Sequence, residues 1–120
     1  MYAVSFINLE ESDKDLIVSF AIDDPEMGIR SLILHRTLFF EEFLDENERG
    51  VNVSLGGSAN ENESLDMLER IEINKGEIKI KSILNEYQLD TSKIEPSEID
   101  EMVSLLRKQN HDDRFLIHVT

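Results

Sequence analysis

Histidine is the residue of this chain best suited to proton transfer or metal binding, because its pKa lies near neutrality. His35, His111 and His118 fall in different expected elements, and no two of them have the spacing of metal ligands. His111 precedes two aspartates, but adjacent side chains in a loop point apart and form only a weak site. The histidines therefore predict neither a metal site nor a catalytic one.

Other chemistries also lack their residue patterns. There is no cysteine, which excludes thiolate nucleophiles, disulfides and thiolate metal sites. No Gly-x-Ser-x-Gly elbow presents a serine, and no glycine-rich turn beside a lysine leads into a helix to hold phosphate. Residues 45–50 resemble a calcium loop, but Arg49 replaces an oxygen ligand and Gly56 stands where the closing glutamate belongs. We therefore expect no enzyme activity, no metal and no cofactor.

Carboxylates remain as the candidate chemistry. The 120 residues include 26 Asp and Glu against 12 Lys and Arg, a net charge of −14. A net charge of about 2–8 in magnitude already keeps a small domain soluble, and surplus like charge costs stability through self-repulsion. Such a surface repels nucleic acid and anionic membranes and attracts basic proteins. We therefore expect a basic protein partner, with no nucleic acid and no membrane.

The acids gather in three stretches, around residues 23–26, 41–48 and 61–69. For any one stretch, a solvated face that only maintains solubility is an equal alternative to a binding role. Carboxylates in a binding role would pair with arginine in a bidentate geometry, and exposed aromatic rings would anchor the contact. The expected partner-binding residues are Phe39, Glu41, Glu42, Phe43, Asp45, Glu46, Glu48, Glu61, Glu63 and Asp66.

Three apolar runs, at residues 3–9, 16–23 and 29–36, are typical of β-strands. In the second run the period of two turns one set of residues inward: Leu16, Val18, Phe20 and Ile22. In the third run Leu32 and Leu34 face inward, and Arg30 and Arg36 share that face near its ends.

Residues 37–44 are ambiguous. A helical turn or loop with Phe39, Phe40 and Phe43 against the core is favoured over continuation of the preceding strand through Phe40. A short strand is expected at residues 51–55.

The second half contains the clearest local signals. Ile71 and Ile73 face Ile78 and Ile80 around an Asn-Lys-Gly turn, a β-hairpin pattern. Acidic residues and a proline at 95–100 open a helix whose apolar stripe is Ile99, Met102, Val103 and Leu106 and which ends at Asn110. Residues 115–119 are expected to form a last short strand or a tail packed against the core. The sequence thus predicts one domain, residues 1–120, of α+β, mostly β class: an antiparallel sheet of about five to seven strands with one C-terminal helix packed on a face.

Part of this pattern resembles a known family. Three stretches carry the resemblance: Asp-Leu-Ile-Val-Ser-Phe-Ala-Ile-Asp-Asp at 15–24, the turn at Gly28, and Leu-Ile-Leu-His-Arg at 32–36. Together with the acidic middle, the hairpin and the late helix, these stretches resemble immunity proteins of bacterial polymorphic-toxin systems, in particular the immunity protein ten family. The chain departs from that pattern in having no tryptophan and in its extra segment at 114–119. The resemblance implies an inhibitor that sequesters a toxin domain, often a nuclease.

The expected function is accordingly that of a cytoplasmic immunity protein, which binds and neutralises a cognate toxin through its acidic surface without turnover. A cytosolic location is expected because the first residues lack a positive, apolar signal-peptide pattern. The alternative is a regulatory or structural interaction module, a homodimer that pairs through an edge strand at residues 115–119.

Overall fold

The computed structural model describes residues 1–26, 28–56 and 66–120. These residues form one mixed sheet and one α-helix, together with two short 3₁₀ helices. The predicted class, α+β and mostly β, is confirmed. The elements in chain order are β1 (Tyr2–Glu11), β2 (Asp15–Asp24), β3 (Gly28–Thr37), η1 (Glu41–Phe43), η2 (Glu46–Glu48), β4 (Asn52–Leu55), β5 (Leu68–Asn74), β6 (Glu77–Ser82), β7 (Glu86–Asp90), α1 (Pro96–Gln109) and β8 (Leu116–Val119).

The sheet differs from the prediction in strand number and in direction. The described residues contain eight strands in the order β4-β3-β2-β1-β7-β6-β5-β8, and two of the pairings, β1 with β7 and β5 with β8, are parallel. The described sheet thus has one strand more than the five to seven expected, and it is mostly but not wholly antiparallel. The additional strand is β7, and the parallel joint at β8 arises because α1 carries the chain back across the sheet before β8 begins.

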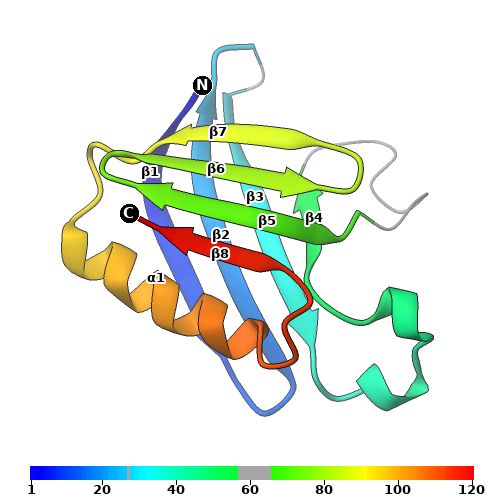
Figure 1. Ribbon diagram of the computed structural model, residues 1–120. Coiled ribbons are helices and arrows are strands. Elements are labelled where there is room, and N and C mark those ends of the chain that lie inside the picture. The colour runs from blue at the N-terminus through cyan, green and yellow to red at the C-terminus, as the bar shows by residue number, and fades with distance from the viewer. Residues whose placement is uncertain (27, 57–65) are drawn as a thin grey trace.

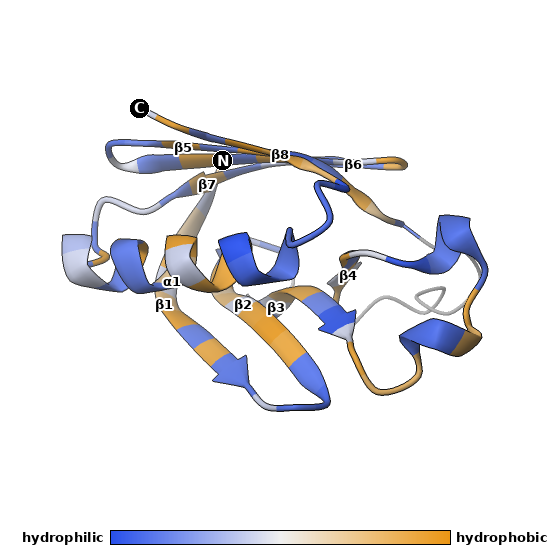
Figure 2. Cartoon of the chain, turned by 60° about the horizontal axis from the view of Figure 1, so that its bottom comes forward, coloured by the Kyte–Doolittle hydropathy of each residue, from blue (hydrophilic) through white to orange (hydrophobic). Residues whose placement is uncertain are grey.

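The sheet folds over on itself into two layers (Figures 1 and 2). Strands β1–β4 form one layer and β5–β8 form the other, and α1 lies between the layers on their open side. On the opposite side β4 meets the start of β5: Val53 N donates to the Asp66 carbonyl at 2.7 Å, and Leu68 N donates to the Val51 carbonyl at 2.8 Å. The edge strand β4 is thus hydrogen-bonded to the start of β5, and β8 forms the other edge of the sheet.

The core lies between the layers and α1. The predicted inward set of β2, Leu16 to Ile22 in steps of two, is buried, and so are Leu32 and Leu34 of β3. The predicted hairpin is confirmed in register, with Ile71 opposite Ile80 and Ile73 opposite Ile78. Alternation therefore predicts these faces correctly, because each strand turns one face to the interior and the other to solvent.

Helix α1 begins where the sequence indicates. Glu95 and Glu98 form a reciprocal capping box, Pro96 occupies the first turn, and Asn110 is the C-cap. Met102 and Leu106 of the predicted stripe are buried and Ile99 and Val103 pack partly against the core, which confirms the stripe. Among the described residues, no helix has the length and apolar composition needed to cross a membrane.

Candidate protein-binding segment

The chain between β3 and β4 forms what we call the aromatic–acidic segment, residues 39–48. It contains η1 and η2, each a single 3₁₀ turn with no buried residue, and lies outside the two layers (Figure 1). The predicted helical turn is confirmed, but the packing of its rings against the core is wrong, because Phe39, Phe40 and Phe43 are 55, 58 and 77% exposed. This exposure is compatible with the place of Phe39 and Phe43 among the expected contact residues. Both 3₁₀ turns lie outside the two layers, so these rings do not reach the core between the layers.

Arg36, the last inward-facing residue of β3, fixes the start of this segment. Its side chain is fully buried, and all five of its N–H donors have acceptors. Nε and Nη2 donate to the Glu41 carboxylate at 2.8 and 2.5 Å, and Nη1 and Nη2 donate to the Asp112 carboxylate at 2.7 and 3.0 Å. The remaining Nη1 hydrogen goes to the Gln109 carbonyl at 2.8 Å. The guanidinium therefore joins β3, η1 and the end of α1.

This arrangement shifts the pKa values of its members. Burial by itself would lower the pKa of Arg36, but the hydrogen bonds and charges of Asp112 and Glu41 outweigh it and raise that pKa above its ordinary value. The hydrogen bond from Arg36 holds the pKa of Asp112 well below its usual range, and Arg114 adds to the effect against a smaller opposing effect of burial. Both groups are therefore charged at neutral pH.

Two further arginines hold the rest of the segment. Arg114 bonds Asp112 through Nε at 2.5 Å, and its Nη1 and Nη2 reach the Glu46 carbonyl and carboxylate, each at 2.8 Å. Arg49 donates to the carbonyls of Leu44 and Glu42 at 3.2 and 3.3 Å. The backbone of η1 and η2 is thus positioned by cations of the chain itself.

The predicted contact residues fall into different environments. Glu41 and Glu46 are engaged with Arg36 and Arg114. Glu42 and Asp45 are exposed and Glu48 is half-buried, and none of these three carboxylates forms an ion pair within the described parts of the chain. Glu61 and Glu63 lie outside the described residues.

Asp66 is not available to a partner, which corrects its inclusion in the predicted set. Its side chain is buried. The carboxylate accepts hydrogen bonds from Ser82 Oγ at 2.7 Å, Leu84 N at 2.8 Å and Asn85 Nδ2 at 2.9 Å. Asp66 therefore organises the turn between β6 and β7, and only the sequence separation of these residues concealed that role.

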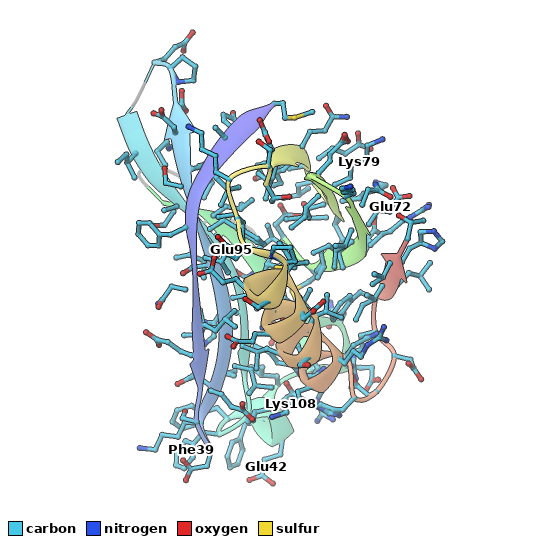
Figure 3. All side chains as sticks on the ribbon, turned by 90° about the vertical axis from the view of Figure 1, so that its left-hand side faces the viewer. Phe39, Glu42, Glu72, Lys79, Glu95 and Lys108 are labelled. Atoms are coloured by element: carbon cyan, nitrogen blue, oxygen red, sulfur yellow. The ribbon has the colours of Figure 1, made fainter. Side chains whose placement is uncertain are left out.

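The exposed rings form a small aromatic surface. The rings of Phe39 and Phe40 meet edge to face with centroids 4.6 Å apart, and Lys14 Nζ lies over the Phe39 ring at 5.5 Å. The Lys14 carbonyl also accepts from Leu38 N at 2.7 Å, so the turn between β1 and β2 supports the segment. In Figure 3, Phe39 and Glu42 project from the same end of the molecule. Phe40, which is not among the predicted contact residues, also belongs to this surface.

One cluster in this region has the residue types of a metal site. Ligand atoms of Glu41, His111 and Asp112 lie within 4.8 Å of one another. However, the Arg36 guanidinium already supplies the cation that two of these three groups bind. The other two histidines lie elsewhere, His35 against Asp15 at 2.7 Å and His118 on β8. Through Arg36, Glu41 and Asp112 connect η1 to the chain just beyond α1.

No protein-family model, curated protein or solved structure matches this chain. The resemblance to the immunity protein ten family therefore stays a prediction based on the residues quoted above.

Proposed function

We propose that this protein binds a basic protein partner through the aromatic–acidic segment and acts by occupancy, without catalysis. The specific form that we propose is an immunity protein, acting in the cytosol, that neutralises a toxin domain with a cationic surface. The observation that carries the proposal is the exposure of three phenylalanine side chains on a backbone that Arg36, Arg49 and Arg114 hold in place.

Exposed aromatic rings on a positioned backbone have the character of binding anchors. Covering a Phe side chain is worth about 1.5–3 kcal/mol, and binding loses little of this to ordering when the segment is already positioned. Aromatic rings also attract cations, and Lys14 over Phe39 is an example within the chain. A partner arginine or lysine over Phe40 or Phe43 would make the same contact.

The charges around the rings favour the same kind of partner. Glu42 and Asp45 are exposed and have no ion pair among the described residues, so they can accept hydrogen bonds from a guanidinium. The net charge of −14 extends the attraction beyond contact distance. Electrostatic steering of this kind raises association rates by about 10–10³-fold and weakens as salt is added. Nuclease toxins carry basic surfaces for phosphate, which makes them suitable partners.

The test uses calorimetric titration with a set of basic proteins that includes the product of the neighbouring gene. Phe43→Ala should weaken binding by about 30-fold, the effect of losing a hot-spot contact of about 2 kcal/mol. Phe6→Ala is the matched control, because Phe6 is an exposed phenylalanine of β1. It should leave the affinity unchanged.

A second pair of variants tests the charges. Glu42→Lys combined with Asp45→Lys should raise the Kd and reduce its salt dependence. Asp23→Lys combined with Glu26→Lys makes the same change in net charge at the turn between β2 and β3, the opposite end of that hairpin from Thr37. If both pairs weaken binding equally, only the overall charge matters and the assigned segment is wrong. If no basic protein binds at all, the proposed function fails.

A further inference from the structure

Strand β8 is an edge strand of the sheet, and no other described strand pairs with its outer side. The opposite edge strand, β4, is bonded to the start of β5, whereas β8 pairs only with β5. Figure 2 shows α1 between the two layers, so the helix does not continue the sheet beyond β8. Protected edges usually carry a charge, a proline or a bulge. The sequence of β8, Leu-Ile-His-Val, has neither charged carboxylate or ammonium groups nor proline, and its pairing with β5 is regular.

The backbone groups that β8 offers follow from its register. Thr120 N donates to the Ile73 carbonyl of β5 at 3.0 Å. Alternate residues of a strand direct their backbone groups to opposite sides. The N–H and C=O groups of His118 therefore face β5, as those of Thr120 do, and the same groups of Ile117 and Val119 point outward. The next outward residue, Phe115, is already bonded: its N–H and C=O are both paired with the Asn110 side chain, at 3.1 and 2.8 Å.

We propose that β8 pairs with β8 of a second copy of this chain, antiparallel and about a two-fold axis at His118. In that register Ile117 of one copy exchanges hydrogen bonds with Val119 of the other, so four outward backbone bonds form. A register centred on Ile117 would instead require the backbone of Phe115, which Asn110 already occupies. The His118-centred register therefore uses the groups that β8 has available.

The charges beside β8 are balanced, so a second copy of this acidic chain can pair there. Leu116 and His118 lie opposite Arg70 and Glu72 of β5, and these two charges pair with each other at 2.9 Å. The edge is thus close to neutral even though the whole chain carries −14. Leu116 and Val119 are 67 and 47% exposed, so pairing also covers apolar surface. Hollows of about 450 and 370 Å³ lie between β8 and α1, at the two ends of the strand.

The dimer and the complex with a basic partner should depend on salt concentration in opposite ways. Two copies of −14 repel each other, so sodium chloride should strengthen the dimer by screening that repulsion. The same salt should weaken binding to a basic protein. The measurement is sedimentation equilibrium of the chain alone, from micromolar to millimolar concentration, at low and high salt. A mass that rises towards twice 13.9 kDa, and does so at lower concentration in high salt, supports the dimer.

Two variants test the register. Val119→Pro removes an outward N–H from each copy while leaving the bonds to β5 in place, and two lost bonds should weaken the dimer by about 30-fold. His118→Lys places two lysines opposite each other and should also weaken it. Gln88→Lys is the control for the added charge, because Gln88 is exposed on β7, which does not pair with β8. Thermal unfolding checks that each variant remains folded. A monomer at every concentration in high salt, or a dimer insensitive to both changes at β8, overturns the proposal. Neither result bears on the aromatic–acidic segment.

Discussion

Arg36 on β3 and Asp112, beyond the end of α1, lie 76 positions apart in the sequence and are joined by two hydrogen bonds of 2.7 and 3.0 Å. The same guanidinium binds Glu41 on η1. One buried side chain thus connects the sheet, the helix and the aromatic–acidic segment. Its contacts allow stability and binding to be tested separately.

Replacing Arg36 tests this connection. Arg36→Met should lower the free energy of unfolding by about 3 kcal/mol, because removing one member of a buried ion pair leaves its partners uncompensated. It should also release the aromatic–acidic segment, which limited proteolysis would detect as faster cleavage between residues 39 and 48. Arg70→Met is the matched control. The Arg70 side chain is half exposed and pairs with Glu72 at the surface, so its loss should cost less than about 1 kcal/mol in urea unfolding.

Acid should weaken the joint at Asp112. The pKa of Asp112 is lower in the folded chain than in the unfolded chain, so folding favours its ionised form. Its contribution to stability is complete above the unfolded pKa of about 3.9 and is lost as the pH falls towards the folded pKa. Asp112→Asn should therefore be less stable than the natural chain at pH 7, and the difference should narrow below about pH 4. Urea unfolding midpoints between pH 7 and pH 3 measure it; a constant difference would contradict the assignment.

Gln109 is a buried polar side chain of α1 whose amide joins the helix to the sheet. Its Nε2 donates to the carbonyls of Leu16 and Leu34 at 2.9 and 3.0 Å. Gln109→Met keeps much of the volume but removes both hydrogen bonds, which at about 1 kcal/mol each should cost about 2 kcal/mol of unfolding free energy. Gln88→Met on the exposed face of β7 is the control, and chemical denaturation should show it nearly unchanged.

Asp66 should matter for stability and not for binding. In the natural chain Ser82 and Asn85 donate to the Asp66 carboxylate. Asp66→Asn replaces one accepting oxygen with an N–H₂ group, which cannot accept these bonds, and should lower the free energy of unfolding by about 2 kcal/mol. Affinity for a basic protein should remain within twofold of the natural chain at a temperature where both are folded. Asp23→Asn, at an exposed position, serves as the control for the loss of one charge. A large loss of affinity on Asp66→Asn alone would place this residue at the interface after all.

Local patterns predicted the parts of the fold that depend on neighbouring residues. The inward face of β2, the register of the hairpin and the stripe of α1 all follow from periodicity, because burial on one face repeats with the period of the element. Alternation even placed Arg36 on the inward face of β3. It could not identify Glu41 and Asp112 as its partners, since Asp112 belongs to a distant part of the chain.

Long-range pairings were the parts that sequence patterns could not supply. β7 has only Tyr87 and Leu89 as apolar residues, and it is a strand because β6 and β1 bond it on both sides. The sequence likewise could not decide whether Phe39, Phe40 and Phe43 are buried or exposed, because an aromatic cluster after a strand is compatible both with core packing and with an exposed anchor. For the candidate site, composition identified the acidic stretch, and only the structure showed which carboxylates the arginines of the chain already hold.

The junction between β1 and β7 has a consequence for the order of folding. Short turns join β1–β3 in one layer and β5–β7 in the other. Apart from the contact of β4 with the start of β5, the described strands of the two layers pair only at Tyr2 with Leu89 and at Ala3 with Asp90. Pairing Tyr2 with Leu89 closes a loop that contains most of the chain, and closing so long a loop is costly in chain entropy. The two meanders should therefore assemble first, and the slow event should be their union, followed by docking of the helix that locks them.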